Sequence, residues 1–256
     1  MSTVNLDLQE LLEFALDAVW EAGRVTLGFY QTSVEAERKA DNTPVTEADR
    51  QAEERLRQLI GRRYPEHRVL GEELGGAPGE GLTWVIDPID GTKSFICGVP
   101  LYANLLALLL DREPVLGILH FPALQETVYA ARGLGCYWNG RRARVSGITD
   151  LKNARVLTSG VEGGSRVDRW RDLARRCYFA RTWGDAYGYA LVATGRAEIM
   201  VDPALELWDA APLQVVMEEA GGTFTDWTGR PTVWAGEGIA TNGKLLDETL
   251  QSLSTS

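Results

Sequence analysis

The chain lacks the cysteines that a disulfide framework or a zinc cluster would need. Its three cysteines, Cys97, Cys136 and Cys177, are widely spaced, odd in number and match no CxxC pattern. We therefore expect free thiols in a reducing cytoplasm. Because neither Cys97 nor Cys136 lies in a glycine-rich loop that also contains arginine, we expect no cysteine nucleophile.

Basic charge and histidine are also scarce. The chain has 26 Lys and Arg residues against 36 Asp and Glu residues, and this formal net charge of -10 argues against a large basic surface for nucleic acid. A protein of this charge needs local groups to bind a phosphate, such as metal ions or backbone amides. The two histidines, His67 and His120, supply little imidazole for acid–base catalysis, and we expect both to be structural.

Long apolar segments are absent as well. The longest strongly apolar run, residues 105–110, is far too short to cross a membrane. The first residues contain acids where a signal peptide would have a basic and then an apolar segment. We therefore expect a soluble cytoplasmic protein with no membrane partner. Its 256 residues, 45% of them hydrophobic, suffice for one large domain or two closely packed subdomains.

The spacing of apolar residues predicts two helices and then several strands in the first part of the chain. Residues 8–29 have helical spacing, and a second helix should begin near Thr46, where TEAD resembles a capping box with Asp49 in the usual Glu position. The charges of this second helix, such as Glu53, are expected on a solvated face. The strand-like segments that follow are HRVLGEE, LTWVIDP, NLLALLLDREPVLGILHFP and ETVYAARGLGCYWNGRRARV.

The pattern changes in the second part of the chain. The pair Asn139-Gly140 predicts a hairpin turn, and after about Ser146 strand-like and helix-like segments alternate. We therefore expect an α/β (α+β) protein in which residues 1–145 form an α+β subdomain and residues 146–256 an α/β subdomain. Catalytic groups from both should meet in the cleft between them.

The segment WVIDPIDGTKSF, residues 84–95, places two acids directly after a buried strand. Pro88 keeps Asp87 extended and removes a ladder donor, so we expect the strand to end there. Asp87 and Asp90 then lie on one tight loop, with the Ile89 carbonyl between them left without a sheet partner. These oxygen ligands suit a hard cation such as magnesium, although the segment alone is equally compatible with an Asp-Pro turn and a threonine helix cap.

Two more acidic motifs lie elsewhere in the chain, in VLGEE at residues 69–73 and in LWDAA at residues 207–211. Singly, Glu72 can be a solvated loop acid, and Asp209 can be an acid favoured near a helix N-terminus. Together with the two aspartates of the DPID segment, they supply enough carboxylates to hold at least two divalent ions.

The motifs GEE, WxxDPIDGTxxF and WDAA occur in this order at suitable spacing. Through them the chain, from residue 8 onward, resembles the inositol monophosphatase superfamily of magnesium-dependent, lithium-sensitive phosphatases. The resemblance implies a layered αβαβα sugar-phosphatase-type fold with two sheets sandwiched between helix layers. It also implies a homodimer, a small phosphorylated metabolite as substrate, and two or three Mg²⁺ ions per site.

The same resemblance implies the metal ligands. Glu72, Asp87 and the Ile89 carbonyl would bind one magnesium ion, and Asp90 and Asp209 would bind a second that Asp87 bridges. Such ions activate a water for in-line attack on the phosphate and stabilise the leaving alkoxide, so no covalent nucleophile is required.

Catalytic and phosphate-binding residues follow from the resemblance too. Thr92 is similar to the family threonine that orients the attacking water together with Glu72, and Gly91 and Thr92 would receive the phosphate. Asp49 matches the acid of a TxxD motif that pairs with this threonine, and its capping role does not exclude that function. Lys39 resembles a family lysine but is one residue out of the expected spacing, so it is left outside the predicted site.

Within the superfamily, the chain looks most like the histidinol-phosphatase branch, through KSFI after DPIDGT, WGD before a tyrosine-containing helix, and VDPALELWD. L-histidinol phosphate carries an ammonium group and an imidazole, so it should prefer acids beyond those that hold metal. Asp185 and Glu206 are the candidate substrate contacts, although Asp185 could instead cap the following helix. Asp202 is more simply explained by an Asp-Pro turn. We expect hydrolysis of L-histidinol phosphate, a step of histidine biosynthesis.

Two alternatives stay open. The substrate could be inositol 1-monophosphate or 3'-phosphoadenosine 5'-phosphate, of which the nucleotide would want an aromatic or basic clamp. The protein could also be a noncatalytic accessory factor that acts through protein partners. Loss of a metal-binding acid would favour this second alternative, yet all four acids are present.

Overall fold

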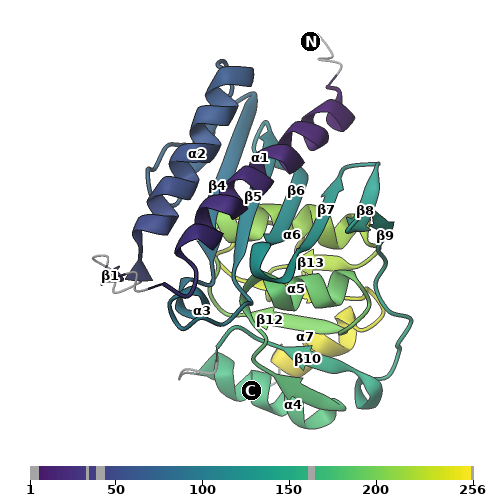
Figure 1. The fold of residues 1–256 in the computed structure, drawn as a ribbon. Coiled ribbons are helices and arrows are strands. Elements are labelled where there is room, and N and C mark those ends of the chain that lie inside the picture. Colours follow the sequence, from purple (N-terminus) through teal and green to yellow (C-terminus); the bar gives the residue numbers. More distant parts are fainter. Residues whose placement is uncertain (1–5, 33–34, 39–43, 161–164, 255–256) are drawn as a thin grey trace.

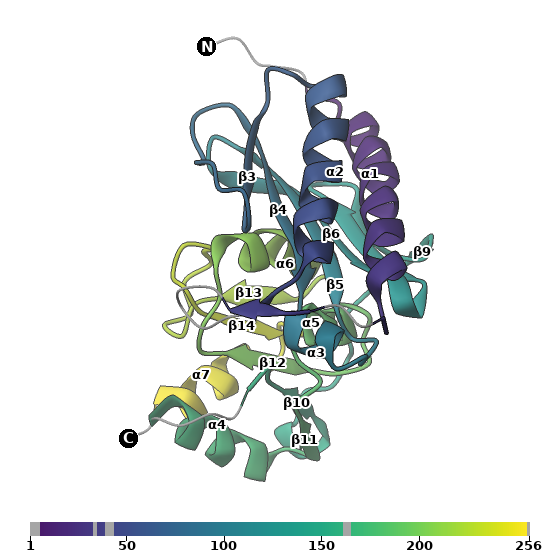
Figure 2. The ribbon, with the colours of Figure 1, turned by 60° about the vertical axis from the view of Figure 1, so that its left-hand side comes forward.

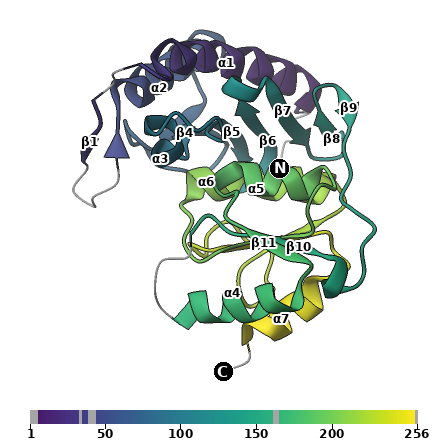
Figure 3. The same ribbon diagram turned by 60° about the horizontal axis from the view of Figure 1, so that its bottom comes forward.

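The computed structural model describes residues 6–32, 35–38, 44–160 and 165–254. They form five layers, in which helices, a seven-stranded sheet, helices, a five-stranded sheet and helices follow one another (Figure 3). The predicted fold class, a layered αβαβα arrangement, is confirmed. A small antiparallel pair, β1 (Glu37–Arg38) and β2 (Pro44–Val45), belongs to neither large sheet.

The first helix layer consists of α1 (Leu8–Phe29) and α2 (Glu47–Arg63), which lie side by side over the seven-stranded sheet (Figures 1 and 2). α1 begins after Asp7, whose carboxylate accepts hydrogen bonds from two N–H groups of the first turn. α2 begins after Thr46, and the predicted capping box with Asp49 is present. In the part of the chain that is described, no helix has the length and apolar composition needed to cross a membrane.

The seven-stranded sheet has the order β3-β4-β5-β6-β7-β8-β9. β3 runs parallel to β4, and all other neighbours are antiparallel. The predicted turn at Asn139-Gly140 joins β8 to β9, with φ angles of 46° and 78° that suit this residue pair. The strands are β3 (Arg68–Gly71), β4 (Leu82–Asp90), β5 (Ala103–Leu110), β6 (Glu113–Phe121), β7 (Glu126–Ala131), β8 (Gly135–Trp138) and β9 (Arg141–Arg142), with the 3-10 helix η1 (Pro122–Leu124) after β6.

The strand that contains Pro88 does not end at that residue. β4 pairs with β5 up to Asp87 and pairs again at Asp90, which leaves Pro88 and Ile89 in an irregular, bulged step of the ladder. A bulge tolerates proline because the extra residues make no regular ladder bond. The prediction that the strand stops at Pro88 is therefore wrong, since a bulge within the strand separates the two acids.

The five-stranded sheet has the order β11-β10-β12-β14-β13. β10 is parallel to β11 and β12, whereas β14 is antiparallel to β12 and β13. Helices α4 and α7 cover its outer face (Figure 3). The remaining elements are α3 (Thr92–Ile96), η2 (Leu151–Asn153), β10 (Arg155–Leu157), α4 (Ser165–Arg176), β11 (Phe179–Arg181), α5 (Asp185–Ala193), β12 (Ile199–Asp202), α6 (Leu207–Glu219), β13 (Thr223–Thr225), β14 (Gly238–Thr241) and α7 (Leu246–Ser254).

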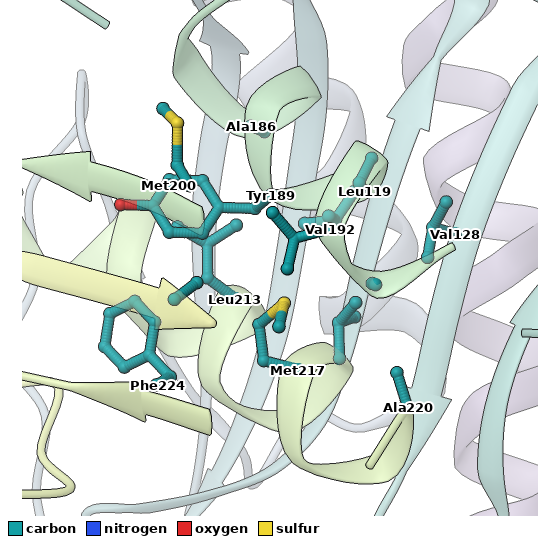
Figure 4. Packing of buried hydrophobic residues seen from close by; sticks show 14 of the residues in the cluster. Leu119, Val128, Ala186, Tyr189, Val192, Met200, Leu213, Met217, Ala220 and Phe224 are labelled. Carbon is teal, nitrogen blue, oxygen red and sulfur yellow. The ribbon is translucent and has the colours of Figure 1, made fainter. Parts of the chain in front are cut away.

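Helices α5 and α6 form the middle layer between the two sheets. Because both sheets pack against them, they are apolar over most of their surface, and Figure 4 shows their side chains meeting residues of both sheets. α6 packs tightly on β6 at Gly117. A Cβ at this position would lie 2.4 Å from the carbonyl oxygen of Pro212, so only glycine allows the helix to pack at this depth.

The two large sheets lie on either side of the predicted subdomain boundary. The seven-stranded sheet uses residues 68–142, and the five-stranded sheet uses residues 155–241. One apolar cluster nevertheless contains side chains from both parts, such as Leu119 and Leu213. The division into residues 1–145 and 146–256 stays a prediction.

Candidate active site

Glu72 follows β3 directly, and a buried acid of α2 holds its turn. The carboxylate of Glu53 accepts hydrogen bonds from the backbone N–H groups of Glu73 at 2.8 Å and Leu74 at 3.2 Å. It also pairs with Arg57 at 2.7 Å. The position of Glu72 therefore depends on a contact between α2 and the turn.

The prediction that Glu53 lies on a solvated face is wrong, because the side chain is fully buried. A Cβ at Gly71 would lie 2.0 Å from a Glu53 carboxylate oxygen, so glycine leaves the room that this carboxylate occupies. Buried carboxylates need hydrogen-bond donors, and the backbone N–H groups of the turn supply them. The one sequence signal for this contact was the glycine before the paired acids.

The bulge of β4 is fixed by three hydrogen bonds. Asp87 Oδ1 accepts from the N–H of Ile89 at 3.0 Å, and Asn104 Nδ2 donates to the carbonyl of Pro88 at 2.5 Å. Thr92 Oγ1 donates to the carbonyl of Ile89 at 3.1 Å. Asn104, which sequence reasoning missed, lies on the neighbouring strand β5 and is fully buried.

Asp209 reaches the same place from the first turn of α6. Its Oδ2 accepts from the N–H of Glu206 at 2.8 Å, which fixes the start of the helix. Carboxylate oxygens of Asp87, Asp90 and Asp209 all lie within 4.8 Å of one another. They line a cleft of about 420 Å³ whose wall consists of Pro44, Glu72, Asp87, Ile89, Asp90, Gly91, Thr92, Lys93, Asp185, Glu206, Trp208 and Asp209.

These acids repel one another. Burial, followed by the charges of Glu72, Asp90 and Asp209, raises the pKa of Asp87 well above its usual value. Burial, followed by the charges of Asp185 and Asp209, does the same to the pKa of Asp90, and burial raises the pKa of Asp209 to about 7. A divalent cation among these oxygens would relieve the repulsion, and a set of oxygen ligands suits a hard cation.

Asp49 is buried and does not line the cleft, although burial and, to a lesser extent, the nearby charge of Glu72 raise its pKa. Its Oδ2 accepts from the N–H of Thr46 at 2.7 Å and from Thr46 Oγ1 at 2.6 Å. Its Oδ1 has no hydrogen-bond partner among the described residues, and burial raises its pKa to about 6. Asp49 thus caps α2 with one oxygen and keeps the other unused. Lys39 lies outside the described residues.

Asp185 borders the same cleft. Its Oδ2 is 2.8 Å from the point where a Cβ of Gly91 would lie, so the carboxylate packs directly over this glycine, whose φ is +80°. Burial raises the pKa of Asp185, and the charge of Lys93 opposes this shift. Lys93, which sequence reasoning did not assign, borders both the main cleft and an adjoining cavity of about 440 Å³.

The two histidines lie outside the cleft. His120 is buried, with Nδ1 2.9 Å from Thr127 Oγ1, and His67 Nδ1 accepts from Trp84 Nε1 at 3.1 Å. Neither residue lines the cleft that holds the acids. The residues that line this cleft therefore offer no imidazole as an acid or base.

Residues 7–256 match the model of the inositol monophosphatase family. A histidinol-phosphatase of Chlorobaculum parvum is 41% identical over 247 residues, covering 93% of this chain and 94% of that protein. A histidinol-phosphatase of Mycobacterium tuberculosis is 40% identical over 257 residues, covering 97% and 98%. Among solved structures, an IMPase of Thermotoga maritima matches with a TM-score of 0.89 at 29% identity, covering 95% of this chain and 96% of that one.

These similarities confirm the predicted family and the predicted enzyme class. Phosphatases of this family depend on metal ions and act on small phosphorylated metabolites, and the cluster of Asp87, Asp90 and Asp209 could bind a metal. The chain belongs to the inositol monophosphatase family and is a phosphoric monoester hydrolase.

Proposed function

We propose that this protein hydrolyses L-histidinol phosphate to L-histidinol and phosphate in a magnesium-dependent reaction. The observation that carries the proposal is the carboxylate of Asp185, which packs over Gly91 and does not belong to the three-acid cluster that could hold a metal. Together with Glu206 in the same cleft, it suits an ester whose alcohol part carries a cationic amine. The two histidinol-phosphatases that are 40% and 41% identical support the same substrate.

Magnesium fits the donors of this site. Glu72, Asp87 and the Ile89 carbonyl would hold one ion, and Asp90 and Asp209 would hold a second one that Asp87 shares. We propose two or three ions per site. When bound, they lower the pKa of a water and neutralise charge on the phosphate and the leaving oxygen.

The protein's own groups position the reactants. Because Thr92 Oγ1 donates its proton to the Ile89 carbonyl, its lone pairs are left to accept a hydrogen bond from the attacking water. Glu72 would hold the same water, and the unused oxygen of Asp49 would support this arrangement. The backbone N–H groups of Gly91 and Thr92 would bind phosphate oxygens.

Inositol 1-monophosphate is the second candidate substrate, because the matching family model is that of the inositol monophosphatases. 3'-Phosphoadenosine 5'-phosphate and a noncatalytic accessory role are the weaker alternatives. We further propose that the protein is cytoplasmic and that it forms a homodimer. Size-exclusion chromatography with light scattering tests the dimer.

The decisive experiment measures phosphate release from L-histidinol phosphate, myo-inositol 1-phosphate and 3'-phosphoadenosine 5'-phosphate, with magnesium and with a chelator. Faster hydrolysis of the inositol ester than of L-histidinol phosphate would refute the substrate assignment. Asp90→Asn should abolish turnover while the protein stays folded. Asp172→Asn, on the exposed surface of α4, is the matched control and should retain full activity.

A further inference from the structure

Asp202 is a buried carboxylate that the proposed chemistry leaves unused. It lies at the end of β12 and is 1% exposed. Its Oδ1 accepts from the N–H of Ser159 at 2.8 Å. Its Oδ2 accepts from Ser159 Oγ at 2.9 Å and from the Tyr189 hydroxyl at 3.0 Å. Both oxygens are thus bound by the protein itself, so Asp202 is poorly suited to contact a substrate directly.

The hydroxyl of Ser159 connects Asp202 to Asp185. Because this hydroxyl donates its one proton to Asp202, its lone pairs are left to accept, and the N–H of Asp185 donates to it at 2.8 Å. The Ser159 hydroxyl therefore donates to Asp202 and accepts from Asp185, so the directions of both hydrogen bonds are fixed. A chain of oriented hydrogen bonds in a partly buried site is stronger than isolated bonds.

Asp185 needs such a restraint because its backbone is strained. Its φ is +53°, which lies in the left-handed region that residues other than glycine rarely adopt. The preceding Gly184 packs so closely on Ser159 that a Cβ there would lie 2.3 Å from the Ser159 Cα. Tyr189 lies one turn further along α5 and also donates to Asp202, so this acid restrains α5 directly at Tyr189 and through Ser159 at Asp185.

The restrained turn faces the reaction site. The carboxylate of Asp185 packs over Gly91, and the N–H of the next residue, Ala186, donates to Asp90 Oδ2 at 2.6 Å. We propose that Asp202 is a positioning residue for substrate selection, which acts through Ser159 to hold Asp185 where it meets the cationic group of the substrate. This inference rests on the proposed function, because it requires a cationic ester.

The test compares kcat and KM for L-histidinol phosphate and for myo-inositol 1-phosphate, which has no amine. Asp185→Asn should lower the preference for L-histidinol phosphate, given as the ratio of the two kcat/KM values, about tenfold. Ser159→Ala and Asp202→Asn should lower the same ratio to a similar extent, chiefly by raising KM for L-histidinol phosphate. In the double variant Ser159→Ala/Asp185→Asn the ratio should fall no further than in the single variants, because both substitutions remove the same interaction with the substrate.

Tyr189→Phe is the matched control. It removes one hydrogen bond from the same carboxylate but keeps the connection through Ser159, so the melting temperature should fall while the ratio stays within about twofold of the original. A ratio that falls as far in Tyr189→Phe as in Ser159→Ala would reduce Asp202 to a general packing role. Unchanged ratios in Ser159→Ala and Asp202→Asn, beside a lowered ratio in Asp185→Asn, would overturn the proposal.

Failure of the proposed function gives a different result. The unaltered protein would then show no preference for L-histidinol phosphate, and the selection role would fall with it. A crystal structure of Ser159→Ala tests the positioning step independently of any substrate. A changed φ at Asp185, with its carboxylate displaced from Gly91, is expected, and an unchanged Asp185 would overturn the connection itself.

Discussion

Replacing Glu53 with glutamine tests how the turn that carries Glu72 is held. The carboxylate of Glu53 accepts two backbone N–H groups and pairs with Arg57. A glutamine has the same shape but offers only one accepting oxygen. One N–H group of the turn would therefore face an NH₂ group, and Arg57 would lose its counter-charge.

The expected magnitude follows from burial. Removing one partner of a buried ion pair costs about 3–5 kcal/mol when the other charge stays buried. The side chain of Arg57 is 26% exposed and can turn toward water, so we expect a smaller loss of about 2–3 kcal/mol. For a chain of this size, such a loss lowers the melting temperature by about 4–12 °C. Displacing Glu72 should also weaken magnesium binding by about tenfold, since groups that orient metal ligands commonly have such effects.

Thermal unfolding and a magnesium titration of activity measure both effects. The matched control is Glu54→Gln, which changes the neighbouring, exposed residue of the same helix and should leave both quantities unchanged. A Glu53→Gln variant with unaltered melting temperature and magnesium requirement would refute the reasoning. Reduced stability with an unaltered magnesium requirement would show that Glu53 stabilises the turn but that the position of Glu72 does not depend on this contact.

Three further predictions concern packing, pH and thiol reactivity. Gly117→Ala should lower the free energy of unfolding by about 1–3 kcal/mol, because its methyl group would meet Pro212. Gly61→Ala should raise it by about 0.5–1 kcal/mol, because no atom lies within 4 Å of the added methyl group. Denaturant titrations measure both changes. Burial lowers the pKa of His120 to about 4. Between pH 6.5 and 4 the unfolded state therefore binds a proton at this residue that the folded state does not bind. The free energy of unfolding should fall by about 3 kcal/mol over this range as the pH is lowered. A His120→Gln variant should lack that loss in denaturant titrations across this range. In mass spectrometry, a thiol reagent should modify exposed Cys97 in the folded protein but buried Cys136, whose pKa burial raises to about 12, only after unfolding.

The features that the sequence predicted well are those that depend on neighbouring residues. The capping box at Thr46 and the hairpin at Asn139-Gly140 are set by a few adjacent side chains, and the structure has both. The layered fold, by contrast, was implied by the resemblance to the inositol monophosphatase superfamily and is confirmed. The structure brings Glu72, Asp87, Asp90 and Asp209 to one cleft, as the motif order implied.

The features that sequence reasoning missed depend on contacts between distant segments. Pro88 favours the end of a strand locally, yet pairing with β5 resumes at Asp90 and turns the interruption into a bulge. Glu53 lies in a strongly charged helix, and its burial is made favourable by Arg57 and by the backbone N–H groups that the turn after β3 brings to it. The contact between Ser159 and Asp202 joins the segment after β10 to the end of β12, and no local pattern relates the two.

The geometry of the cleft depends on the middle helix layer as much as on the acidic motifs. Asp209 and Asp185 both lie in the first turns of helices that pack between the two sheets, whereas Asp87 and Asp90 belong to one sheet. A shift of α6 would move Asp209 away from Asp87, and a shift of α5 would move Asp185 and break the hydrogen bond from Ala186 to Asp90. Close packing transmits such shifts, because a dense interior leaves no free space to absorb them. The tight contact of α6 with β6, and the buried Asp202 that accepts from Tyr189 of α5, therefore help to set the geometry of the proposed metal and substrate sites, although neither need touch the substrate.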